Sequence, residues 1–98
     1  MAISIIVQDQ IHEEHSTTAG LPAVTLADIV LDAPVGSMMR GIHKYADTMF
    51  NSYQLKFFLE ELSEFEPKNS AESELISVLR SASDEAIRIH GYLWFSGD

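Results

Sequence analysis

One apolar repeat near the C-terminus constrains the fold of this chain more than any other feature. Its members recur at steps of four, three, four, three and four residues: Leu75, Leu79, Ala82, Ala86, Ile89 and Leu93. This spacing places them on one face of an α-helix. Asn69, followed three residues later by Glu72, has the pattern of a capping box. The repeat predicts a helix from about Ser70 to about Phe95, which only Gly91 would end early.

A second amphipathic segment precedes this helix. Its apolar stripe consists of Leu55, Phe58, Leu59, Leu62 and Phe65. Asn51 and Gln54 again have capping-box spacing, so they predict where the helix begins. Because the connection to the last helix is short, the two helices are expected to pack antiparallel.

The N-terminal half has weaker patterns. The sequence ISIIV (residues 3–7) is typical of a strand, and residues 8–22 are polar enough to indicate a loop. TLADIVL (residues 25–31) fits a short helix or a buried strand, so the structure of residues 1–35 stays open. Ser37 is in a position to cap a helix through residues 38–50. The fold prediction is mainly α, a small antiparallel bundle of three or four helices, with one or two short N-terminal strands as an addition and an α+β fold as the alternative.

Composition limits the possible functions. At 98 residues the chain is expected to form a single domain, residues 1–98, and it contains no cysteine. Fifteen acidic residues against six basic ones give a net charge of −9. Such a surface repels nucleic acid and anionic membranes and attracts basic proteins. No signal peptide or membrane anchor is recognisable, which favours a cytoplasmic location.

Catalytic and metal-binding patterns are weak. His12 and His15 lie three residues apart, a spacing that two ligands on one helix face would need, but a solvated loop is the favoured interpretation and metal binding stays open. No nucleophile motif is present. We therefore predict neither an enzyme nor a bound cofactor.

Acidic and aromatic residues of the two helical segments are the predicted partner-binding site. Phe57 is rotated about 100° from Phe58, so Phe57 or its neighbour Tyr53 is expected to face solvent as an anchor. The predicted site comprises Glu60, Glu61, Glu64, Glu66, Glu72, Glu74, Tyr53 and Phe57.

Two short segments, HKYADTMFNSYQ (residues 43–54) and YLWFSGD (residues 92–98), carry a resemblance. Together they resemble small acidic bacterial proteins that share DTxFNxxQ and a C-terminal LWFxGD, some of which are similar to toxin-immunity proteins. The resemblance covers about the last 60 residues and implies a mainly helical, cytosolic bacterial protein. It carries over no catalytic residue.

The leading hypothesis is therefore an immunity or inhibitor protein that neutralises a basic toxin such as a nuclease. The alternative is a structural or regulatory helical homo-oligomer, for instance a homodimer, and a metal-binding protein or enzyme ranks below both. The chain end is expected to be held by Leu93 and Trp94 on the last helix and by Asp98 near Arg40 or Lys44.

Overall fold

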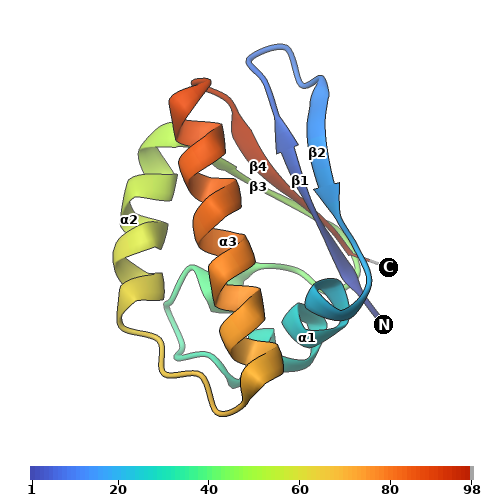
Figure 1. The fold of residues 1–98 in the computed structure, drawn as a ribbon, viewed down its shortest axis with the longest axis vertical. Coiled ribbons are helices and arrows are strands. Elements are labelled where there is room, and N and C mark those ends of the chain that lie inside the picture. The colour runs from blue at the N-terminus through green and yellow to red at the C-terminus, as the bar shows by residue number, and fades with distance from the viewer. Residues whose placement is uncertain (98) are drawn as a thin grey trace.

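The chain folds into an α+β structure in which helices cover one face of a four-stranded antiparallel sheet (Figure 1). The computed structural model describes residues 1–97. In chain order the elements are β1 (Ile3–Gln8), β2 (Glu14–Thr18), α1 (Leu21–Ile29), the 3₁₀ turns η1 (Val30–Asp32) and η2 (Met39–Gly41), β3 (Asp47–Asn51), α2 (Ser52–Ser63), α3 (Ser70–Arg88) and β4 (Tyr92–Gly97). The prediction of a mainly helical bundle is wrong, because both chain ends and two middle segments build a sheet.

The sheet has the strand order β2-β1-β4-β3, so the first and last strands of the chain lie side by side at its centre. Ile3, Ile5 and Val7 of β1 are buried on the helix side, whereas the residues between them are only partly covered. This alternation is what a strand with one buried face requires. The expected N-terminal strand is confirmed, but β2 lies within the segment that was predicted to be a loop.

The predicted last helix is correct only as far as Arg88. His90 adopts a left-handed conformation with φ 55°, its N–H donates to the carbonyl of Ile87, and the N–H of Gly91 donates to the carbonyl of Ala86. These two hydrogen bonds form a Schellman motif, which ends the helix.

Beyond Gly91 the chain alternates with a period of two instead of continuing the helical repeat. Leu93 and Phe95 are fully buried, while Tyr92 and Trp94 lie on the opposite face of the sheet. Leu93 therefore reaches the core from a strand, and Trp94 is not part of a helix face. The expected position of Asp98 lies outside the described residues.

The predicted helix over residues 38–50 is also wrong. Only the turn η2 forms there, and residues 47–51 pair with β4, with Met49 opposite Trp94 and Phe50 opposite Leu93. Phe50 contributes to the core together with Phe58 and Phe95, their ring centroids lying between 5.1 and 6.3 Å apart. Tertiary pairing of this segment with the C-terminal strand outweighs its weak helical pattern, which Gly41 interrupts.

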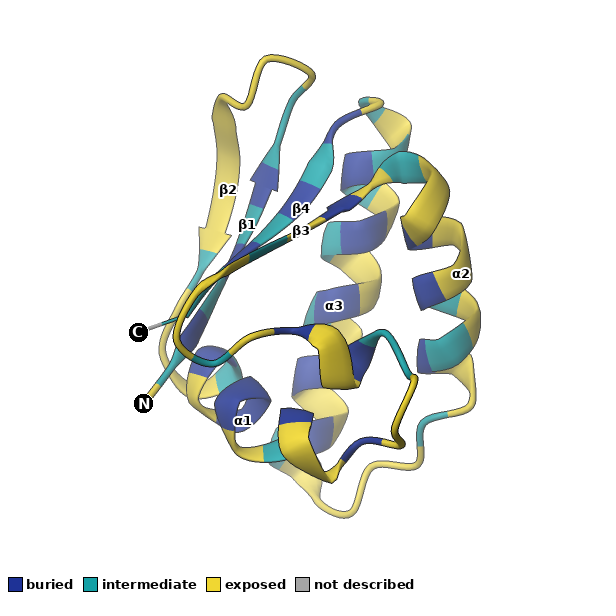
Figure 2. Ribbon diagram, turned by 180° about the vertical axis from the view of Figure 1, so that it is seen from behind, coloured by how far each residue is buried: buried dark blue, intermediate teal, exposed yellow. Residues whose placement is uncertain are grey.

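The prediction of α2 and of α3 as far as Arg88 is confirmed, including the caps at which both helices begin. Asn51 and Gln54 form a complete capping box, each side chain accepting the other residue's backbone N–H at 2.8 and 2.9 Å. Asn69 caps α3 by accepting the N–H of Glu72 at 2.9 Å. The helices run antiparallel over the sheet, and their apolar faces meet it in one core (Figure 2). For residues 25–31 the sequence left a short helix and a buried strand open. These residues are helical, because residues 25–29 belong to α1 and residues 30–31 to the turn η1.

Candidate functional site

Four of the eight predicted binding residues lie in one line on the solvent side of α2 and its C-cap residue Glu64. Tyr53, Phe57, Glu60 and Glu64 recur at steps of four, three and four residues, so they lie within about 60° of one another around the helix. The core-facing residues Leu55, Phe58 and Leu62 occupy the opposite side. We call these four residues the α2 stripe.

Two exposed aromatic rings form the first half of the α2 stripe. The side chains of Tyr53 and Phe57 are 67% and 49% exposed, and their ring centroids lie 5.2 Å apart in an edge-to-face arrangement. Such a pair exposes a large apolar area that is already held in one geometry. Aromatic side chains of this kind are the residues that most often anchor protein interfaces.

The second half of the α2 stripe leads into a groove of about 430 Å³ at the end of the helix. Glu61, Glu64 and Glu66 contribute carboxylates to its wall. Its remaining lining consists mostly of apolar and small residues from the 33–39 segment and from the helix end: Ala33, Pro34, Ser37, Met39 and Phe65. A groove with an apolar floor and an acidic wall accommodates a lysine or arginine, whose stem is apolar and whose end group is cationic.

The groove is electrostatically negative for two reasons. In residues 1–97 the only ion pair within 4 Å joins His15 to Asp9, so no base of that part of the chain neutralises these glutamates at contact distance. In addition, α2 ends at Ser63, and the C-terminal end of a helix carries partial negative charge.

Two of the predicted site residues make hydrogen bonds inside the protein. The Glu61 carboxylate accepts the backbone N–H groups of Met38 and Met39 at 2.8 and 2.9 Å, which fixes the 33–39 segment against α2. The Glu72 carboxylate is buried and accepts the N–H of Lys68 at 3.1 Å. Both carboxylates therefore hold neighbouring backbone segments in place by hydrogen bonds.

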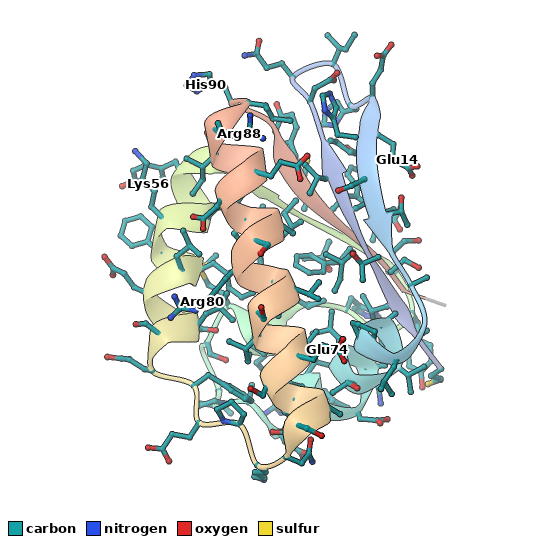
Figure 3. All side chains as sticks on the ribbon, in the orientation of Figure 1. Glu14, Lys56, Glu74, Arg80, Arg88 and His90 are labelled. Carbon is teal, nitrogen blue, oxygen red and sulfur yellow. The ribbon has the colours of Figure 1, made fainter. Side chains whose placement is uncertain are left out.

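The structure does not bring Glu74 to the same surface. Glu74 lies on α3 on the side that faces α1, whereas α2 packs on the other side of α3 (Figure 3). The eight predicted residues thus divide into the α2 stripe, the groove residues Glu61 and Glu66, the buried Glu72 and the separate Glu74.

The two histidines of the β1–β2 hairpin are held by local contacts. His12 stacks on Tyr92 with ring centroids 4.4 Å apart, and its Nδ1 lies 2.9 Å from Gln8 Oε1. His15 Nε2 lies 3.3 Å from Asp9 Oδ2. Within residues 1–97 no group of three or more His, Asp or Glu side chains is close enough to hold a metal ion.

Asp9 organises this hairpin. Its Oδ1 accepts the N–H groups of Glu13 and Ile11, at 2.9 and 3.0 Å. The hydrogen bond from Glu13, followed by those from Ile11 and His15, lowers the pKa of the Asp9 carboxyl below its usual 3.8.

Sequence reasoning missed the groove floor, because Ala33, Pro34 and Met39 belong to a segment far from α2 in sequence. It also missed a second hollow of about 230 Å³, whose lining includes Arg40, His43 and Lys44. The sequence contains one sign of this second hollow. No Lys or Arg precedes Arg40, and His43 and Lys44 follow it within four residues.

The chain matches no protein-family model, no curated protein and no solved structure. None of the helices in residues 1–97 is long and apolar enough to cross a membrane.

Proposed function

We propose that this protein is a small interaction protein that binds a basic partner protein through the α2 stripe and the adjoining groove. The observation that carries the proposal is that the stripe and the groove are continuous. Exposed aromatic rings at Tyr53 and Phe57 are followed by carboxylates at Glu60 and at the C-cap residue Glu64, along one side of α2 and its end. The rings would supply buried contact area, and the acidic half would attract the partner and speed its association.

An immunity or inhibitor protein for a basic toxin, such as a nuclease, is the specific form of this function that we favour. The net charge of −9 supports it, because carboxylates can occupy the positions where a nuclease binds phosphate. The resemblance of residues 43–54 and 92–98 to small bacterial proteins is a further argument for it. On this proposal the protein acts by binding and needs neither catalytic chemistry nor a cofactor.

The first experiment identifies the partner by co-purification from the native cells. Bait proteins would be the natural chain, the variant Tyr53→Ser/Phe57→Ser, and the control Leu21→Ser/Val24→Ser, which removes exposed apolar side chains from α1 instead. We expect a basic protein to be retained by the natural chain and the control and lost with the stripe variant. Equal retention by all three baits, or retention of an acidic protein only, would refute the proposed surface.

The second experiment measures association with the purified partner. Changing Glu60 and Glu64 to Lys should slow association by at least tenfold at low salt and flatten its salt dependence. The charge-matched control reverses Glu74 and Asp84 of α3 and should have a smaller effect. If the partner is a toxin, co-expression of the natural chain should restore growth of cells that produce it. A chain that is a stable dimer with Tyr53 and Phe57 buried in the dimer interface would instead support the homo-oligomer alternative.

A further inference from the structure

A second site lies at the far end of the sheet, where β4 ends against the loop that leads into β3. The N–H of Gly97 donates to the carbonyl of Ala46, and Gly97 lies directly against the backbone of Lys44. Next to this contact is the hollow of about 230 Å³, lined by Leu31 and by residues 40–45. Its lining shares no residue with the α2 stripe or the acidic groove, although Arg40 is hydrogen-bonded to Ala33 of the groove.

The polar side chains of this hollow are hydrogen-bond donors. Arg40 and Lys44 carry positive charge and no acceptor. The Nδ1 of His43 accepts the backbone N–H of Tyr45 at 3.0 Å, so the neutral ring carries its proton on Nε2, which is then a donor as well. Among residues 1–97 no acidic residue lines the hollow, and neither Arg40 nor Lys44 forms an ion pair with another residue of that range.

Two of the three donor residues, Arg40 and His43, are held by hydrogen bonds to the surrounding loop. The N–H of His43 donates to the hydroxyl of Thr48 at 3.0 Å, and one guanidinium nitrogen of Arg40 donates to the carbonyl of Ala33 at 3.1 Å. The remaining guanidinium N–H groups make no hydrogen bond to another group of residues 1–97. Pre-ordering of this kind lowers the entropy cost of binding.

Apolar surface completes the hollow. Leu31 and Tyr45 are 57% and 59% exposed, and Ile42 is buried beneath them. The volume of about 230 Å³ leaves room for a small organic ligand. Two cationic side chains beside this apolar surface match a dianionic group on a small apolar or aromatic body.

We propose that this hollow binds a small phosphate monoester, with Arg40, His43 and Lys44 contacting the phosphate and Leu31 and Tyr45 contacting the organic group. Phosphate fits better than carboxylate because its charge of about −1.5 to −2 at neutral pH balances both cations. The site is independent of the proposed function, since it shares no residue with the α2 stripe or the groove.

The test is a titration of the ¹⁵N-labelled full chain with phenyl phosphate, inorganic phosphate and benzoate, followed by NMR at constant ionic strength. Phenyl phosphate should give saturable shifts confined to Leu31 and residues 40–45. Benzoate should bind at least fivefold more weakly. Lys44→Met should weaken phenyl phosphate binding about tenfold, the equivalent of one charge-assisted hydrogen bond, whereas the matched control Lys56→Met on α2 should not change it.

Tyr45→Ala separates the two halves of the site, because it should weaken binding of phenyl phosphate and leave binding of inorganic phosphate unchanged. Scattered or non-saturating shifts, or equal weakening by Lys44→Met and Lys56→Met, would mean general charge screening and would overturn the proposal. Benzoate that binds as tightly as phenyl phosphate would overturn the assignment of phosphate.

Discussion

Gly91 lies directly against the backbone carbonyl of Gln8, so closely that a Cβ atom at position 91 would overlap the carbonyl oxygen. The contact is made at the point where α3 ends and the chain turns into β4. Gln8 is paired with Tyr92, the first residue of that strand. The glycine therefore permits the two central strands of the sheet to begin their pairing immediately after the helix.

Gly91→Ala should destabilise the protein by at least about 2 kcal/mol, because the added methyl group forces β1 and β4 apart. The measurement is urea unfolding followed by circular dichroism. A helix through position 91 would give the opposite sign, since alanine is about 1 kcal/mol more favourable than glycine inside a helix. The neighbouring change His90→Gly serves as the control: it should stabilise the protein by up to about 1 kcal/mol, because glycine adopts the left-handed conformation more easily.

Glu61→Ala should destabilise the fold by about 2 kcal/mol, the usual cost of losing hydrogen bonds to a charged acceptor. The Met38 and Met39 N–H groups lose their partner, and the 33–39 segment loosens from α2. Hydrogen exchange should show faster exchange at these two amides. The control Glu60→Ala removes an exposed glutamate one residue earlier and should change stability by less than about 0.5 kcal/mol. If Glu61→Ala and Glu60→Ala lowered the free energy of unfolding equally, the hydrogen bonds of Glu61 would contribute nothing beyond what an exposed glutamate contributes.

Asn51→Ala should cost about 1 kcal/mol, because the N–H of Gln54 at the start of α2 loses its acceptor. Gln54→Ala should cost less, since only the N–H of Asn51 loses its acceptor and can bind water instead. Unfolding of both single variants and the double variant measures the coupling between the two residues. Strict additivity of their effects would argue against a reciprocal capping box.

The β1–β2 hairpin should loosen selectively in acid. Because the pKa of Asp9 is lower in the folded protein than in the unfolded chain, its contribution to stability is complete above the unfolded value near 3.9 and is lost as pH falls through the folded pKa. NMR titration should give an Asp9 pKa below 3.8. Asp9→Asn should reduce the protection of the Ile11 and Glu13 amides against hydrogen exchange at neutral pH. In this variant the protection should no longer fall as the pH is lowered, because the side chain does not titrate. An unshifted pKa would contradict the geometry of the hairpin.

The sequence by itself determined α2 and most of α3, because their stripes and caps depend on residues no more than four positions apart. Asn51 with Gln54, and Asn69 with Glu72, act locally and needed no tertiary partner to be recognised. The β-branched content that predicted the first strand is equally local. The same helical geometry predicted that Phe57 or Tyr53 faces solvent, and in the structure both do.

Only the tertiary structure decided the end of the chain and the sheet. Leu93 fits the helical repeat and the strand alternation equally well, and the choice depends on pairing with Val7, more than 80 residues away in the sequence. The β3 segment likewise becomes a strand because β4 is there to pair with it. The groove floor and the cationic hollow required the 33–46 segment to be folded back onto other elements. Hydrogen bonds and close contacts between distant segments leave no periodic signal in a single sequence, which is why these features appear only in the folded molecule.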